Sequence, residues 1–299
     1  MEYDYKVLED GSIEMYLYKE EKAVIEIPSI IYNRPVTSVS FYHFDGKWQK
    51  ELYIPKTIKH IYDDGFYGMK RLEKIVVDEE NPVYDSRNNC NAIIETATNK
   101  LVRASKNTII PNDIKIIGKN SYQGLNIEKI IIPDNVTIIE DNAFFESPFI
   151  KEIKLSKNIV KIGKAAFFAS AGLEEIEIPA SVEVIGENAF GMCDGLRKIT
   201  FCNDSKIREI GSMHAFNLKK LEKIDTGNNL NNIITYLILY YIIALDMDLP
   251  VEDKDIGVLN KYELEFFMEK AREKEKIILL NRLIAEYHRK YGGGSNLFI

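Results

Sequence analysis

One stretch of sequence decides the fold of this chain: Ile178-Pro179-Ala180-Ser181-Val182-Glu183-Val184-Ile185-Gly186-Glu187-Asn188-Ala189-Phe190-Gly191-Met192-Cys193-Asp194-Gly195-Leu196. Just before it, glutamate and isoleucine alternate over residues 175–178, which is the period of a half-buried strand. Pro179 cannot donate a main-chain hydrogen bond, so it predicts the end of that strand. Val182 and Ile185 predict a second short extended segment, and Gly186 a turn where a side chain would be strained or crowded.

The same pattern recurs along the chain at a constant spacing. Its proline place is taken by Pro133, Ser156, Pro179 and Cys202, each 23 residues after the one before. The strand phrase recurs at residues 72–77, 127–132, 150–155, 173–178, 196–201 and 221–226. A period of this length is typical of a solenoid, in which each unit buries its apolar face only against its neighbours. We therefore predict a repeat solenoid with short parallel β-strands.

The phrase I-P-x-x-V-x-x-I-G-x-x-A-F-x-x-C-x-x-L-x-x-I resembles the BspA-like leucine-rich repeats of bacterial surface proteins. Residues 178–199 match it at nearly every fixed position, and the resemblance covers about residues 4–226. The resemblance implies a right-handed leucine-rich repeat superhelix with its parallel sheet on the concave side. It also implies adhesion or another form of protein binding, often at the surface of the bacterial cell.

We divide the chain into a repeat domain over residues 1–226 and a helical region over residues 227–299. Asp10-Gly11 is a tight-turn signal between two apolar segments, and it predicts a hairpin that caps the first repeat. Gly227-Asn228-Asn229 predicts the end of the repeats. The helical region is expected to be a C-terminal cap or a docking module.

An insertion near residues 79–108 lengthens one repeat. Asp78 stands at the proline place of its repeat and lies 33 residues before Pro111, in place of about 23. Residues 91–96 and 100–103 flank a short polar turn, which predicts a second hairpin. This hairpin is either local padding or a binding loop, because irregular insertions in solenoids often carry contacts.

Residues 233–245 form an apolar run 13 residues long. A membrane-spanning helix needs about 20 such residues, so we expect a buried helix here. Apolar faces after residue 259 predict further helices, and the pattern leaves open whether there is one long helix or two. The start of the chain lacks the basic and apolar regions of an export signal. The protein is therefore expected either at the cell surface, by family resemblance, or in the cytoplasm if Met1 is the native start.

The composition and the motifs argue against an enzyme. The net charge is −7 with a pI near 5.4, whereas nucleic-acid binding needs a basic stripe. Three cysteines are too few for a disulfide framework or for a zinc site with four cysteine ligands. The four histidines form no H-E-x-x-H motif, and the sequence contains no P-loop or G-x-S-x-G. We predict no catalytic residue, no cofactor, no metal, no nucleic-acid partner and no membrane insertion, and the oligomeric state stays open.

The repeat pattern predicts which side chains face outward from the sheet. One row is expected to contain Tyr53, Val76, Ile109, Ile131, Lys154, Glu177, Thr200 and Asp225. The adjacent row is expected to contain Glu51, Lys74, Asn107, Lys129, Glu152, Glu175, Lys198 and Lys223. The first four members of the first row are apolar or aromatic, which would form an exposed patch. The hypothetical protein-binding residues are Tyr53, Val76, Ile109, Ile131, Lys74 and Lys129. Alternatively, the insertion covers this patch, or its residues merely favour strands.

Three functions are compatible with this pattern. The first is a non-enzymatic protein-binding scaffold that resembles a bacterial cell-surface adhesin and binds host or other proteins, such as an extracellular-matrix protein, through the concave sheet. The second is an intracellular adaptor that docks a partner through the helical tail. The third is a carbohydrate-binding surface protein, which is the weakest because Tyr53 is the single aromatic residue in the two rows.

Overall fold

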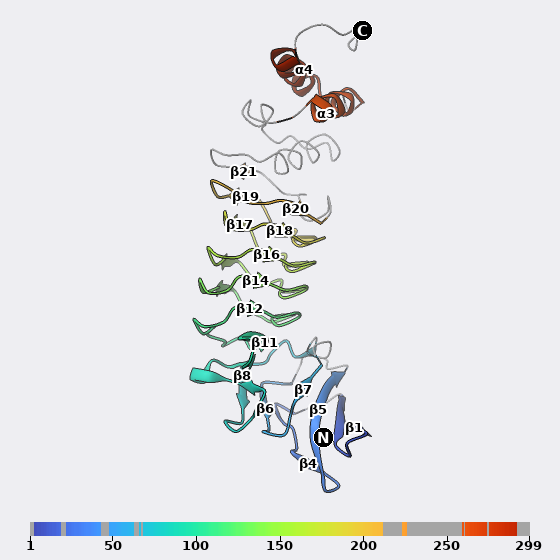
Figure 1. The fold of residues 1–299 in the computed structure, drawn as a ribbon, viewed down its shortest axis with the longest axis vertical. Helices are drawn as coiled ribbons and strands as arrows, with labels where there is room; N and C mark the ends of the chain where they lie inside the picture. Colours follow the sequence, from blue (N-terminus) through green and yellow to red (C-terminus); the bar gives the residue numbers. More distant parts are fainter. Residues whose placement is uncertain are drawn as a thin grey trace.

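The structure is a computed structural model, and it describes residues 3–18, 22–42, 48–62, 66, 68–211, 223–225, 259, 261–273 and 275–291. Figure 1 shows successive turns of chain stacked along the long axis of the molecule, with the N-terminal strands at one end. Each regular turn contributes one short strand to each of two stacks. The predicted repeat solenoid of short parallel strands is therefore confirmed.

The first stack contains the strands of the repeated apolar phrase. They are β3 (Val24–Glu26), β6 (Glu51–Ile54), β8 (Lys74–Val77), β13 (Lys129–Ile131), β15 (Glu152–Lys154), β17 (Glu175–Ile178), β19 (Lys198–Phe201) and β21 (Lys223–Asp225). They form three separate parallel sheets, in the orders β3-β6-β8, β13-β15 and β17-β19-β21. In β17, Ile176 and Ile178 are buried while Glu175 and Glu177 are exposed. The alternation of the sequence is therefore the alternation of the two faces of the sheet.

The second stack is continuous over eight strands, in the order β20-β18-β16-β14-β12-β11-β10-β9. Its regular members are β12 (Ile116–Ile117), β14 (Ile138–Ile139), β16 (Lys161–Ile162), β18 (Val184–Ile185) and β20 (Glu209–Ile210). They pair in parallel with equivalent residues opposite one another, as Ile117, Ile139 and Ile162 do. Each turn thus closes its core with one isoleucine from this stack.

Aromatic rings from successive turns stack in the core. The ring centroids of Tyr122 and Phe144 are 4.8 Å apart, those of Phe144 and Phe167 are 4.9 Å apart, and those of Phe167 and Phe190 are 5.1 Å apart. All four side chains are buried. This ladder fixes the register of one turn on the next, because each ring fits only against the ring at the same place of its neighbour.

The repeated glycine serves close packing between turns. A Cβ atom on Gly186 would lie 2.4 Å from the main-chain nitrogen of Lys164, and one on Gly163 would lie 2.6 Å from that of Asp141. Neither glycine has a positive φ. Crowding by the preceding turn, rather than backbone strain, is therefore the reason for a glycine at this place.

The N-terminal end is covered by the predicted hairpin. β1 (Tyr3–Val7) pairs antiparallel with β2 (Ile13–Tyr18), and Gly11 in the turn has a φ of +81°. β2 continues in parallel with the long strand β5 (Arg34–Tyr42). β5 also pairs with the short strands β4 (Ile30–Ile31) and β7 (His60–Ile61). This sheet caps the core of the first turns.

The insertion contains the second predicted hairpin. β10 (Ala92–Glu95) pairs antiparallel with β11 (Lys100–Ala104) and with β9 (Tyr84–Asp85), and the 3₁₀ turn η2 (Arg87–Asn89) connects β9 to β10. β11 also pairs in parallel with β12. The hairpin therefore supplies the second-stack strand of its own turn.

Two helices follow in the described part of the C-terminal region, which answers the question that the sequence left open. They are α3 (Lys261–Glu273) and α4 (Ile277–Tyr291). The Tyr287 hydroxyl donates to the Glu265 carboxylate at 3.0 Å and joins the two helices. The helix expected at residues 233–245 lies outside the described residues, and the division at residue 226 stays a prediction. Among the residues that the structure describes, no helix has the length and apolar character needed to cross a membrane.

Candidate protein-binding surface

Tyr53 and Val76 lie opposite one another on β6 and β8, as the repeat predicts. Both side chains are half-buried. The Tyr53 hydroxyl donates to the Glu51 carboxylate at 2.7 Å and accepts a hydrogen bond from the Lys74 ammonium at 2.8 Å. The hydrogen bond that Glu51 accepts from Tyr53 lowers the pKa of Glu51, and the one that Lys74 donates to Tyr53 raises the pKa of Lys74. The Tyr53 hydroxyl is therefore engaged within its own sheet, and the role of Tyr53 as an aromatic anchor stays a prediction.

Ile109 departs from the predicted frame. Residues 105–110 form no strand, so neither Ile109 nor Asn107 stands in a sheet row. The main-chain nitrogen of Ile109 donates instead to the Cys90 oxygen at 3.1 Å, and the Thr108 hydroxyl donates to the Asn91 oxygen at 2.7 Å. The insertion folds back beside this segment, while the Lys106 nitrogen still donates to the Leu72 oxygen, just before β8, at 2.8 Å. Ile109 is nevertheless 76% exposed.

Ile131 and Lys129 lie on β13 and face outward as predicted. Ile131 is 58% exposed and pairs with Lys154 on β15. The Lys129 ammonium lies 2.8 Å from the Glu152 carboxylate, and both side chains are more than half exposed. An ion pair this exposed contributes little to stability, so Lys129 can exchange its partner at small cost.

A groove separates residues 106–112 from residues 127–133, with a volume of about 490 Å³. Its lining residues are Lys106, Thr108, Ile109, Ile110, Asn112, Tyr122, Ile127, Lys129, Ile130, Ile131 and Pro133. The lining is mostly apolar, and it holds two lysines and no carboxylate. The groove brings together Ile109, Ile131 and Lys129 of the six residues predicted from the sequence. Tyr53, Val76 and Lys74 are not part of its lining.

Tyr122 is one of the eight lining residues that sequence reasoning missed. It stands at the place of the repeat where Phe144, Phe167 and Phe190 stand in the following turns. Its side chain is 2% exposed, and its hydroxyl is buried without a hydrogen-bond partner. Burial raises the pKa of this phenol well above its usual range. The exchange of phenylalanine for tyrosine in one turn of the ladder is visible in the sequence and is the signal that points to it.

Arg103, on β11, lies in the core between Phe66 and residues 120–123. Its guanidinium lies 5.2 Å from the Phe66 ring centroid and donates to the main-chain oxygens of Met69, Asn120 and Gln123, each at 3.2 Å. Burial lowers the pKa of Arg103 to about 9, so the group stays charged at neutral pH. Carbonyl dipoles here take the place of a counter-ion, and they hold the insertion against the turns on both sides of it.

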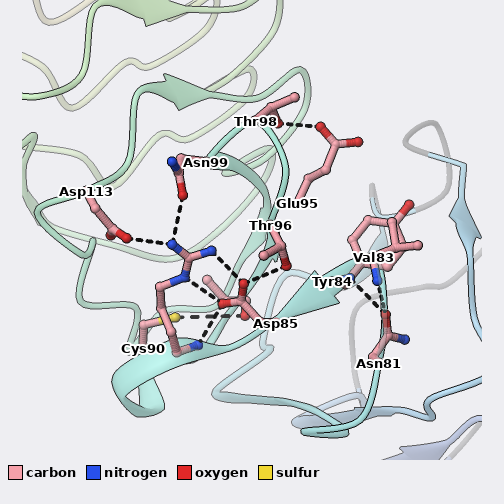
Figure 2. Close-up of polar contacts among 12 residues, drawn as sticks. Asn81, Val83, Tyr84, Asp85, Cys90, Glu95, Thr96, Thr98, Asn99 and Asp113 are labelled. Carbon is pink, nitrogen blue, oxygen red and sulfur yellow. Dashed lines mark hydrogen bonds and ion pairs between the residues drawn. The ribbon is translucent and has the colours of Figure 1, made fainter.

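Arg87 fixes the other end of the insertion. In Figure 2, Asp85, Asn99 and Asp113 converge on its guanidinium, with donor–acceptor distances of 2.5 to 2.8 Å. Burial raises the pKa of Asp85, but the hydrogen bonds from Arg87 outweigh it and lower the pKa overall. Asn99 lies in the hairpin turn and Asp113 in the next repeat. The insertion is therefore held rigidly, and the groove beside it has a fixed wall.

The three cysteines are free thiols. Burial raises the pKa of Cys90 to about 11 and that of Cys193 to about 12. Burial and a hydrogen bond to Glu177 raise the pKa of Cys202 to about 11. Thiols with such pKa values are poor nucleophiles at neutral pH. The described ranges also contain no cluster of three histidine, cysteine or acidic side chains that could hold a metal ion.

Comparison with protein families now identifies the repeat. The description "BspA type Leucine rich repeat region" matches six copies over residues 12–110 and 115–243. The chain belongs to the BspA-type leucine-rich repeat family. This family and its solenoid fold generally serve as non-catalytic scaffolds. A comparison with proteins of curated function finds no match.

Solved structures of bacterial leucine-rich repeat proteins are similar to this chain. A leucine-rich repeat protein from Eubacterium ventriosum is 17% identical with a TM-score of 0.50, over 76% of this chain and 89% of the other, which shows the shared fold. A leucine-rich cell surface protein from Faecalibacterium prausnitzii is 14% identical with a TM-score of 0.38, over 70% and 92% of the two chains. The pneumococcal vaccine antigen PcpA is 16% identical with a TM-score of 0.48, over 70% and 59%.

Proposed function

We propose that this protein is a non-enzymatic scaffold that binds another protein through the groove between residues 106–112 and 127–133. The observation that carries the proposal is the exposure of two large apolar side chains, Ile109 and Ile131, on the walls of one groove. Apolar side chains scattered singly are ordinary on a protein surface, but a pair that shares a concave site is typical of a binding surface.

The rigid surroundings of the groove support the same function. Arg87 and Arg103 tie the insertion to neighbouring turns, and the stacked rings fix those turns on one another. A surface that is held in place before binding loses little conformational entropy when a partner arrives. The insertion is then more than padding, because it provides one wall of the site.

Among the finer possibilities we favour a cell-surface adhesin that binds a host protein, by likeness to the family's bacterial surface proteins. An intracellular adaptor that docks through α3 and α4 is the second candidate. The exposed Ile278 on α4, at 80%, is the observation in its favour.

The test is capture of proteins by the purified chain, read by mass spectrometry, from host extracellular-matrix proteins and separately from bacterial lysate. The variant Ile109→Glu/Ile131→Glu places two carboxylates in the groove. The matched control is Ile278→Glu, which changes an equally exposed isoleucine on α4. Matrix proteins captured by the native chain and by the control, but not by the groove variant, support the adhesin. If Ile278→Glu alone abolishes capture, the adaptor is supported. If neither variant changes capture, both proposed sites are contradicted.

A further inference from the structure

The groove lies where the ladder of the first stack is interrupted. On its far side, β13 bonds to β15, for example from the Ile132 nitrogen to the Lys154 oxygen at 2.9 Å. Over the described residues 105–131, no main-chain hydrogen bond joins β13 to the 105–110 segment. In a parallel ladder, alternate residues serve opposite edges of a strand, so the main-chain groups of Lys129 and Ile131 face the groove. β13 therefore offers an unpaired strand edge there.

This interruption differs from the one between β15 and β17. There the two turns remain in close contact, since a Cβ atom on Gly172 would lie 2.5 Å from the Pro148 oxygen. Beside β13, in contrast, the segment 105–110 is drawn toward Cys90 and the insertion, and the space that a strand of this turn would fill is the groove. The strand edge of β13 is thus accompanied by room for an additional chain.

The buried Tyr122 hydroxyl distinguishes this turn from the three that follow it. The equivalent places in the next three turns are occupied by phenylalanine, and the rings stack in the same way. The fold itself therefore does not need a hydroxyl at this place. A buried hydroxyl without a partner is unfavourable, and this one belongs to a residue that lines the groove.

The charges of the groove indicate the character of the occupant. Lys106 and Lys129 are the charged residues of the lining, and both are held by surface carboxylates outside it, Glu73 at 2.7 Å and Glu152 at 2.8 Å. The same lining contains the exposed side chains of Ile109 and Ile131. An occupant that matches this lining carries both apolar side chains and carboxylates.

We propose that an extended peptide segment of the partner adds to the free edge of β13 as a parallel or antiparallel strand and fills the interrupted place in the first stack. Its apolar side chains contact Ile109 and Ile131, and its carboxylates pair with Lys106 and Lys129. Main-chain pairing provides affinity, while the alternating side chains provide selectivity. The inference rests on the proposed protein-binding function and specifies how the partner is recognised.

The test uses a display library of random linear octapeptides, selected on the intact chain, with enriched peptides resynthesised with blocked ends. We expect apolar residues at alternate positions and a carboxylate beside them. N-methylation of the alternate amides that pair with β13 should weaken binding by more than tenfold, and N-methylation of the others should have little effect.

Two results would overturn the inference and leave the protein-binding function standing. The first is enrichment of peptides that bind undiminished to the Ile109→Glu/Ile131→Glu chain, because they occupy another site. The second is whole-protein capture that depends on Ile109 and Ile131 without any peptide enrichment, because the partner is then recognised as a folded surface. A different result would be that the native chain captures no whole protein but still binds peptides selectively. That result would count against the proposed function alone.

Discussion

Replacement of Phe167 by alanine should test the aromatic ladder as the device that couples neighbouring turns. Phe167 is fully buried, and its ring lies nearly parallel to those of Phe144 and Phe190, at 3° and 5°. A buried phenylalanine replaced by alanine costs about 3–5 kcal/mol, since apolar contacts are lost and a cavity remains. Two stacking contacts are lost together, so we expect a value in the upper half of that range.

The loss should be local, because each turn of a solenoid contacts only its neighbours. Hydrogen exchange read by mass spectrometry should show reduced protection in residues 141–193 and unchanged protection in the N-terminal sheet, residues 13–41. Urea denaturation would give the total loss. The control is Phe168→Ala, which removes a half-buried ring that stacks on Phe145 at 5.3 Å, and we expect it to cost about 1 kcal/mol. A loss below about 1.5 kcal/mol for Phe167→Ala, or a uniform loss of protection along the chain, would refute the role given to the ladder.

Three further outcomes follow from single sites. Gly186→Ala should destabilise the fold by about 1–3 kcal/mol in urea denaturation, because the new methyl group would lie 2.4 Å from the Lys164 nitrogen; an unchanged midpoint would mean that the turns can move apart. Tyr122→Phe should stabilise the unliganded chain by about 1–3 kcal/mol by removing an unsatisfied hydroxyl, and a lower midpoint would show that the hydroxyl is bonded after all. Cys202 should react with iodoacetamide at pH 8.5 about a hundredfold more slowly in the folded chain than in urea. The reason is that its pKa of about 11 in the folded chain lies above the unfolded value near 8.5. Glu177→Gln should speed the reaction of the folded chain. The stability that Cys202 contributes is complete below about pH 8.5 and is lost as the pH rises through 11, so a melting temperature that did not fall over this interval would contradict the shift.

Much of the architecture could be predicted from the sequence because the deciding signals are local. Alternation over residues 175–178 determines which side chains enter the core, and the constant spacing places the same residues in the next turn. The hairpins around Gly11 and at residues 92–104 were predictable for the same reason, since turn residues lie between two apolar segments.

Ile109 was predicted to lie in a strand of the sheet, and this prediction was wrong because its position depends on contacts distant in sequence. The pattern around it suits a strand, but its neighbour in space is determined by how the insertion folds back and brings Cys90 beside it. The groove arises from that displacement, so its lining could not be read from the repeat. Ile131 was found because β13 keeps the regular frame. The unpaired hydroxyl of Tyr122 is a property of the packed core and could not be read from the repeat.

The two strand stacks differ in continuity, and this difference has a mechanical consequence. The second stack is hydrogen-bonded without a break from β9 to β20, whereas the first is divided at two places, beside the insertion and between β15 and β17. A hydrogen-bonded ladder resists stretching along the column more strongly than side-chain contacts across a gap. Any force that flexes the column should therefore leave the second stack nearly constant in length and change the width of the two gaps in the first stack, one of which is the groove. If a partner binds in the groove as proposed, tension along the column should change its affinity.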